Sequence, residues 1–350
     1  MLAVLGLSLS RLGQTSGQRL KPGKYFQWLC LTVLGRTSML QSERTRMIRP
    51  RLAVTAIATI GLALFATDSA AQTSDAPRCG AGVHESQALG VVGFPEDQIF
   101  CPTVADPKEA RSFVSLLRGT FRSLDDPSGE GTTIASVGLG DSFGLVRWGG
   151  PEPNEGVQLD VVGSIFAQFD LGAPSNDLIN ADYLIGLPLT FRRSGFSTRL
   201  KLYHQSSHLG DEYLLRDEEI DRENLSFESI ELLASQEVGP LRVYAGGERL
   251  FRREPDPLPS KLFHGGAELR TGRAGALQLV GGVDLKATDL HDWSPAVSLR
   301  AGVEMARRGS GDHPARLVTL MLEVYEGPSP YGQFFQDDIS YIGVGLHFGL

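Results

Sequence analysis

The stretch that decides the fold is the last one, Ile339-Ser-Tyr-Ile-Gly-Val-Gly-Leu-His-Phe-Gly-Leu350. From Ile342 to Leu350 every second residue is apolar, which places these side chains on one side of an extended strand. A strand with one apolar face at the chain terminus is typical of bacterial outer-membrane β-barrels. The segment therefore predicts both a fold class, the β-barrel, and a cellular location, the outer membrane.

The same alternation recurs upstream, between connections that are alternately short and long. Short connections fall at 193–195 and 238–240, whereas long ones fall at 171–178 and 207–223. Short periplasmic turns and long outer loops produce this rhythm in membrane barrels, and an even number of strands places both termini in the periplasm. The candidate strands are 111–119, 133–148, 156–170, 179–192, 196–206, 224–237, 241–252, 261–270, 275–287, 295–306, 315–326 and 338–350. We predict an all-β, antiparallel transmembrane β-barrel of about 12 strands.

The polar side of these strands carries full charges of both signs. A soluble β-sandwich would also alternate, but charged side chains suit the lumen of a barrel better than the core of a sandwich. We expect these residues to face the lumen, where they either line a small pore or pair with one another and fill it. They are Asp160, Arg199, Lys201, Glu248, Asp284, Arg300 and Glu304.

The N-terminal region indicates export. Four arginines between positions 44 and 51 precede the apolar run 52–66, which is followed by Ser69-Ala-Ala71. This order of features predicts a secretory signal peptide. We expect residues 1–46 to be a non-native upstream extension, 47–71 the signal peptide, 72–108 a short irregular periplasmic segment, and 109–350 the barrel.

Charge and cysteine content limit the function further. Residues 1–71 hold nine Lys or Arg and two acidic residues, so the remaining chain is more acidic than the net charge of −8 indicates. Such a chain repels phosphate backbones, and we expect no nucleic-acid partner.

Cys79 and Cys101 remain after export, and a pair of cysteines in an exported chain predicts a disulfide.

Several stretches resemble family 1207 of the numbered bacterial domains of unknown function. They are Ala105-Asp-Pro-Lys-Glu109, Phe166-Ala-Gln-Phe-Asp-Leu171, Asp177-Leu-Ile-Asn-Ala-Asp-Tyr-Leu-Ile-Gly-Leu-Pro-Leu189, Leu202-Tyr-His-Gln-Ser-Ser-His-Leu-Gly-Asp-Glu212, Val283-Asp-Leu-Lys286, His291-Asp-Trp-Ser-Pro295 and Ser329-Pro-Tyr-Gly-Gln-Phe334. The resemblance spans roughly 95–350. It implies an outer-membrane protein and assigns no activity, so no site residue follows from it.

One constellation could carry chemistry. His204 and Ser206 share the parity of the predicted lipid-facing residues of their strand, close enough for an imidazole to accept the hydroxyl proton. Asn224 or Glu228 on the next strand could orient the imidazole. The arrangement is similar to that of outer-membrane phospholipase A and lipid A deacylase, although those families have Asn where this chain has Ser207. The alternative is that both residues are ordinary polar positions at the membrane interface.

A metal site is a weaker hypothesis in the same region. His204, His208 and Glu212 have the spacing of one helix face, but a predicted strand precedes them, so we expect no catalytic metal. The acidic loop that contains Asp211 and Glu212 could hold Ca²⁺.

The sequence thus predicts a structural barrel, or one that passes or binds small solutes, in the outer membrane of a Gram-negative bacterium. The alternative function is a lipid-facing Ser/His hydrolase that acts on acyl esters of phospholipid or lipid A. The expected partners are outer-membrane lipid and lipopolysaccharide, and the barrel-assembly machinery through the C-terminal strand.

Overall fold

The computed structural model describes residues 90–121, 131–150, 155–216, 224–272, 274, 276–307 and 316–349. The predicted upstream extension and signal peptide lie outside these residues. The strands are β1 (Val91–Gly93), β2 (Ser112–Phe121), β3 (Thr132–Gly149), β4 (Gly156–Asp170), β5 (Leu178–Arg193), β6 (Phe196–Leu209), β7 (Leu225–Val238), β8 (Leu241–Glu254), β9 (Lys261–Arg270), β10 (Leu277–Thr288), β11 (Pro295–Arg307), β12 (Arg316–Pro328) and β13 (Asp338–Gly349). Short helices are α2 (Asp211–Leu214), η2 (Asp289–His291) and η3 (Gly332–Phe334). None of the helices in this part of the chain is long and apolar enough to cross a membrane.

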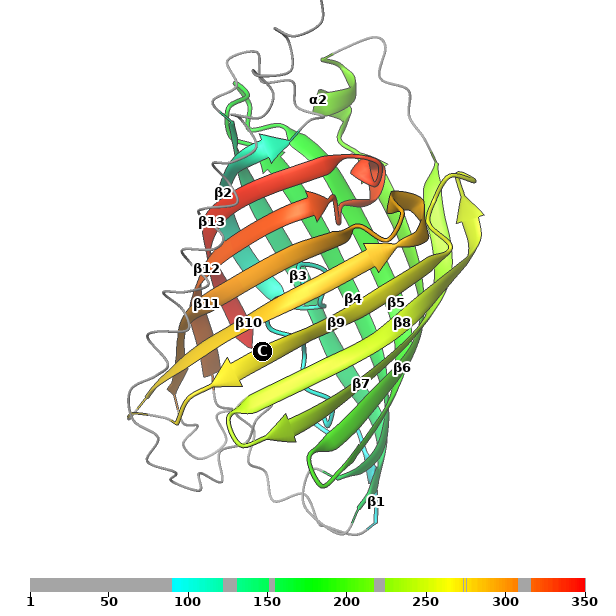
Figure 1. Cartoon of the computed structure of the whole chain (residues 1–350), viewed down its shortest axis with the longest axis vertical. Coiled ribbons are helices and arrows are strands. Elements are labelled where there is room, and N and C mark those ends of the chain that lie inside the picture. Colours follow the sequence, from blue (N-terminus) through cyan, green and yellow to red (C-terminus); the bar gives the residue numbers. More distant parts are fainter. Residues whose placement is uncertain are drawn as a thin grey trace, which may run out of the picture. The chain divides into compact units, whose positions relative to one another are not determined.

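Strands β2 to β13 form a closed antiparallel barrel (Figure 1). The last strand closes the ring on the first, because β13 pairs with β2 from Ile339 opposite Phe121 to Phe348 opposite Ser112. The predicted twelve-stranded fold is confirmed. Strand β1 pairs with β3 at Trp148, beyond the last β3 residue that β2 reaches, Gly138, and so covers an edge that β2 leaves unpaired.

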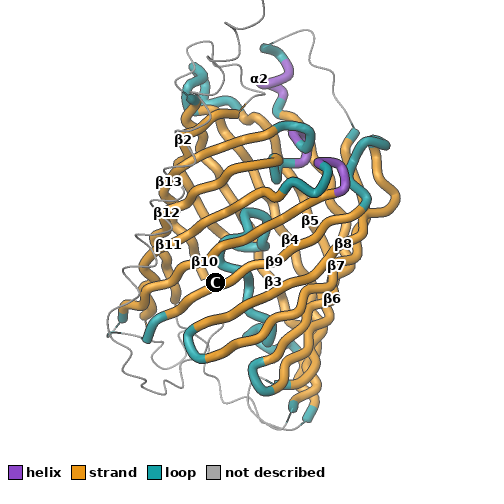
Figure 2. The backbone as a smooth tube through the Cα atoms, in the orientation of Figure 1, coloured by secondary structure: helices purple, strands orange, loops and turns teal. Residues whose placement is uncertain are grey.

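The two ends of the barrel differ in their connections. At one end the strands are joined by tight turns, such as Ser194–Gly195, where both residues have positive φ (49° and 78°) and glycine relieves the strain. At the other end, longer loops carry α2, η2 and η3 (Figures 1 and 2). We refer to these as the turn end and the loop end.

Side chains separate cleanly between the two faces of the wall. The outward face is apolar and exposed, for example at Leu187, Leu202 and Leu232, whereas the inward face is largely polar and buried. Alternation with period two therefore produces a lipid-compatible exterior and a charged interior, as the sequence predicts.

Candidate functional site: a plugged lumen and its mouth

A segment without regular structure, residues 97–111, lies inside the barrel, and we call it the plug. The plug begins at the turn end, where Arg147 of β3 donates a hydrogen bond to the carbonyl of Asp97 (2.7 Å). It ascends to Lys108, which contacts β5, and returns to the turn end at Ser112, where β2 begins. Figure 1 shows this part of the chain (cyan) within the ring of strands, and Figure 2 shows it as loop.

Besides the pair of Asp97 with Arg147 of β3 (2.9 Å), three ion pairs with Lys or Arg join the plug to three further strands. Asp106 contacts Lys286 of β10 (2.7 Å), Lys108 contacts Asp182 of β5 (2.6 Å), and Glu109 contacts Arg199 of β6 (2.7 Å). The six side chains are all less than a quarter exposed. Removal of one partner from such a pair leaves an uncompensated buried charge, which costs about 3–5 kcal/mol. The plug is therefore fixed from several sides of the lumen.

Hydrogen bonds to the backbone and contacts of an aromatic ring also hold the plug in the lumen. Val104 N donates to Oε1 of Glu268 (2.6 Å), and the Arg300 guanidinium donates to the carbonyls of Val104 (3.3 Å) and Asp106 (3.2 Å). These bonds satisfy backbone groups that a buried loop would otherwise leave unpaired. The Cζ atoms of Arg199 and Arg242 lie 4.9 and 4.8 Å from the centroid of the Phe100 ring, within the range of cation–π contacts.

The surrounding charges fix the ionisation of the plug carboxylates. Burial alone would raise the pKa of Glu109, but the adjacent Arg199 guanidinium outweighs it and lowers this pKa to about 2. Burial opposes ionisation of Asp106 as well, and the positive charge of Lys286 lowers its pKa below the ordinary value. Both carboxylates are therefore ionised at neutral pH and hold the plug electrostatically.

The seven predicted lumen residues divide between the plug and the space beside it. Arg199 and Arg300 bind the plug directly. Asp284 accepts hydrogen bonds from Tyr244 and lies 2.6 Å from His264. Asp160 accepts from Gln158, Glu304 pairs with Arg270, and Lys201 pairs with Glu231. The seventh, Glu248, lies in the cavity described next.

A cavity of about 160 Å³ lies between the plug and the loop end, and we call it the mouth cavity. Asp106 and Lys108 of the plug contribute to its lining. Its wall includes Tyr203, Phe227 and Leu250, from β6, β7 and β8. Residues of the loops complete it: Leu258 and Pro259, His291, and Tyr331, Gly332 and Phe335. The cavity thus joins an apolar wall to charged groups.

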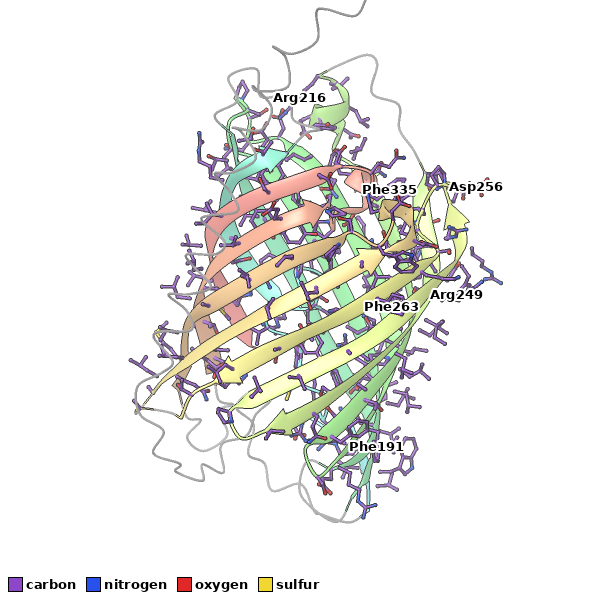
Figure 3. The ribbon with its side chains drawn as sticks, in the orientation of Figure 1. Phe191, Arg216, Arg249, Asp256, Phe263 and Phe335 are labelled. Atoms are coloured by element: carbon purple, nitrogen blue, oxygen red, sulfur yellow. The ribbon has the colours of Figure 1, made fainter. Side chains whose placement is uncertain are left out.

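Hydrogen bonds hold the loops over this cavity. Gly332 N donates to Oδ2 of Asp182 (3.1 Å), and the Gln333 amide donates to the carbonyl of Ser207 (2.7 Å). Nε2 of His291 lies 2.8 Å from the Phe335 carbonyl, which ties the β10–β11 loop to the β12–β13 loop. Figure 3 shows Phe335 at the loop end of the barrel. The mouth is therefore shaped by ordered loops.

Two polar groups in the mouth cavity have spare bonding capacity. Glu248 accepts hydrogen bonds from Tyr203 and from Ser229 (2.6 Å), and no described cation forms an ion pair with it. The Oγ1 atom of Thr288 is buried and has no hydrogen-bond partner among the described residues. A buried polar atom without a partner is costly unless a water or ligand contacts it.

The predicted hydrolase residues lie on the outer face of the barrel. His204 is exposed, and its register partner on β7 is Glu228. Nδ1 of His204 lies 3.6 Å from Oε1 of Glu228, with the His204 side chain 45% exposed. Ser206 is half-buried on the same face of β6, and among the hydrogen bonds of the described residues none joins it to His204.

The other predicted groups are placed apart from this pair. Asn224 donates to Glu254 (3.2 Å). Asp211 and Glu212 are exposed in the first turn of α2. No group of three or more His, Cys, Asp or Glu side chains in the described ranges is placed to hold a metal ion. Calcium at the loop with Asp211 and Glu212 stays a prediction.

The predicted disulfide involves one described residue. Cys101 is buried in the plug beside Arg192, whose guanidinium pairs with Glu237 (2.6 Å). Cys79 lies outside the described residues, so its pairing with Cys101 also stays a prediction.

Sequence reasoning missed the plug and the apolar part of the mouth cavity. One signal was visible in β7, where Leu225, Phe227 and Leu233 occupy the inward parity. Leu225 and Phe227 line the mouth cavity, and Leu233 packs against Phe100 of the plug. Apolar residues on the lumen side of a barrel strand indicate that something apolar covers them.

Comparisons with known proteins identify one family and several similar structures. The family described as "Protein of unknown function (DUF1207)" matches residues 65–350. The Escherichia coli outer membrane phospholipase A is 14% identical, with a TM-score of 0.44 over 69% of this chain and 92% of that chain. The calcium-bound outer membrane phospholipase dimer of Salmonella typhi is 13% identical, with a TM-score of 0.45 over 71% of this chain and 94% of that chain.

A third similar structure is the translocator domain of the autotransporter NalP from Neisseria meningitidis. It is 8% identical with a TM-score of 0.32, over 69% of this chain and 87% of that chain. No curated protein matches the chain. At these identities and TM-scores the similarity carries no argument about the activity of this chain.

Proposed function

The chain belongs to the DUF1207 family, and from the geometry of its lumen we propose that it is an outer-membrane barrel that binds a small amphipathic solute in the mouth cavity. The observation that carries the proposal is the cavity itself, which has an apolar wall, charged groups in its lining and ordered loops above it. Small-molecule sites combine a concave apolar lining with a few placed polar groups in this way.

The size and polarity of the cavity define the solute. A cavity of about 150 Å³ accommodates a benzene-sized group. Phe227, Leu250 and Leu258 would contact such a group, while Glu248 and the unpartnered Thr288 hydroxyl would bind a polar head that donates hydrogen bonds. The segments that resemble the family support this location: all but Phe166–Leu171 contribute a residue to the lining.

The plug argues for binding over free passage of solutes. Because ion pairs to β5, β6 and β10 hold it across the lumen, a solute in the mouth cavity meets a closed floor. The proposal includes export by the signal peptide, residence in the outer membrane of a Gram-negative bacterium, and entry of the solute from the loop end.

Saturation-transfer NMR on the purified protein in detergent tests the proposal, with benzyl alcohol as the probe. We expect saturable binding at about millimolar concentration, weakened at least about tenfold by Leu258→Trp, which fills the cavity. Leu215→Trp is the matched control, because Leu215 is 86% exposed and lies outside the cavity. Equal binding by wild type and Leu258→Trp would overturn the proposal, as would the absence of saturable binding.

A second candidate is the lipid-facing hydrolase, which the 3.6 Å approach of His204 to Glu228 favours. In this mechanism Glu228 orients the imidazole of His204, which accepts the proton of Ser206 as its hydroxyl attacks an acyl ester. The ester C–O bond then breaks as the imidazolium gives this proton to the leaving alcohol, and water hydrolyses the acyl-serine to release the fatty acid. The His–carboxylate pair and the serine lie on the outer face of the barrel, which in an outer membrane would contact such a substrate.

Fatty-acid release from phospholipid and lipopolysaccharide, with and without Ca²⁺, tests the hydrolase. Release should fall at least about a thousandfold in Ser206→Ala. Ser226→Ala is the control, because Ser226 is the register partner of Ser206 on β7. Absence of release by folded wild-type protein, or equal loss in both variants, would remove this candidate.

A further inference from the structure

A group of cations lies on the outer face of the barrel near the loop end, and we call it the outer basic cluster: Arg249, Arg252 and Lys261. Arg249 of β8 and Lys261 of β9 are register partners and are both exposed, so their side chains leave the wall side by side. Figure 3 shows Arg249 projecting outward from the wall.

A β-bulge adds the third cation. The β7–β8 register shifts between Ser226 and Glu228, and Arg252 has a positive φ of 47°. As a result Phe251 and Arg252, which are adjacent in the chain, are both exposed instead of alternating between the two faces.

In the part of the chain that the structure describes, these cations differ from those in the lumen in forming no side-chain ion pair with a carboxylate. Arg199, Arg242 and Arg300 each pair with a glutamate inside the barrel. Within the described residues, none of the three cations of the outer basic cluster forms an ion pair with Asp or Glu. Nearby Glu228 pairs with His204 instead, and Arg253 donates to the Leu258 carbonyl. Since no described carboxylate neutralises the cluster, it can accept an external anion.

Exposed aromatic rings place the cluster at the boundary of the apolar band. Phe263 and Trp293 are 63% and 42% exposed, and their ring centroids lie 5.1 Å apart. Toward the turn end, the outward side chains of β8 are Val243 and Leu241. Aromatic rings between an apolar band and polar loops mark the membrane interface in β-barrels.

We propose that the outer basic cluster is a binding site for the phosphate group of an anionic lipid. Arginine presents a planar set of donors that matches phosphate oxygens, and the adjacent Lys261 supplies a second positive charge. The acyl chains of the same lipid would lie along Phe263 and the apolar outward face below it. A lipid therefore satisfies both the charge and the apolar surroundings, whereas free phosphate satisfies only the charge.

Native mass spectrometry of the purified protein in a non-ionic detergent tests this site. The probes are phosphatidic acid and phosphatidylcholine with the same short acyl chains. We expect wild type to bind phosphatidic acid at least about tenfold more tightly than phosphatidylcholine. Each cation near an anionic lipid contributes about 1 kcal/mol, or about fivefold, so Arg249→Gln/Lys261→Gln should weaken phosphatidic acid binding about 25-fold.

Arg193→Gln is the matched control, because Arg193 is an exposed arginine at the turn end, on β5. It should leave the affinity for phosphatidic acid unchanged. Equal affinity for the two lipids, or equal loss in Arg193→Gln and the double variant, would overturn the proposal. Inorganic phosphate should not displace the bound lipid, and displacement at equal concentration would assign the site to free phosphate.

Discussion

The two parts of the lumen differ in how their inward-facing charged and polar side chains are paired. Toward the turn end the charged wall is matched by the plug, whose Asp106, Lys108 and Glu109 each meet an opposite charge. Toward the loop end the wall becomes apolar at Phe227 and Leu250, and Glu248 forms no ion pair with a cation of the described residues. In the first part the charges of the plug and the wall are paired, whereas the second has surfaces that a solute could complete. On this basis the plugged part closes the lumen, and the mouth cavity is the part that we propose binds a solute.

The largest effect should come from reversing a charge that holds the plug. Arg199 pairs with Glu109 of the plug and Glu231 of the wall, so Arg199→Glu places three carboxylates together in a buried site. We expect about 3–5 kcal/mol of lost stability and release of the plug. In planar bilayers, wild type should be silent and the variant should conduct.

Arg193→Glu is the control for this experiment, because it makes the same change at an exposed position. Conductance by wild type equal to that of Arg199→Glu would show that the plug does not close the lumen, and the contrast between the two parts of the lumen would be lost.

The limits of sequence reasoning follow the same division. The strands and their two faces could be predicted, because period-two alternation depends on local pattern alone. The plug could not, because the partners of Asp106 and Glu109 lie 180 and 90 positions away along the chain. Nothing in the segment 97–111 identifies which strands it meets. The apolar inward residues of β7 indicated a covering group without identifying it.

For the candidate hydrolase pair, the pairing register of β6 and β7 gives information that the parity of the residues does not. Parity places His204 and Glu228 on the outer face of neighbouring strands, but Asn224 has the same parity. Only the pairing of His204 opposite Glu228 distinguishes them, and Asn224 instead contacts Glu254. Parity is local, whereas register depends on the loop that joins the two strands.

A smaller effect is expected from removing the apolar anchor of the plug. Phe100 is 2% exposed and packs against Leu233 and Tyr244. Phe100→Ala should cost about 3 kcal/mol and increase trypsin cleavage after Lys108 and Arg111, because the plug leaves the lumen more often. Phe94→Ala is the control, since Phe94 is 67% exposed. If both variants resist trypsin as wild type does, the apolar contact is not what retains the plug.

Acid should loosen the plug by titrating its carboxylates. Burial opposes ionisation of Glu109, but Arg199 lowers its pKa from 4.5 to about 2. A lowered pKa in the folded state means that this contribution is fully present above pH 4.5 and is lost as the pH falls toward 2. Pepsin cleavage at Phe100, normalised to the cleavage of the denatured protein, should rise as the pH falls from 4.5 toward 2. Glu109→Gln should make the dependence shallower, and an unchanged profile in that variant would contradict the assignment.

The smallest effect should come from the mouth cavity, where the wall is least constrained. Tyr203→Phe removes one hydrogen bond to Glu248, which retains the bond from Ser229 (2.6 Å). We expect a loss of about 1 kcal/mol or less in stability, because the carboxylate keeps a donor and faces a cavity that solvent can enter. Urea unfolding of the detergent-refolded protein measures it. Tyr244→Phe is the matched control: its hydroxyl donates to Asp284 beside the plug, and it should cost more. If Tyr203→Phe were the more damaging of the two, the mouth cavity would be the rigid part of the lumen and the plugged part the adaptable one.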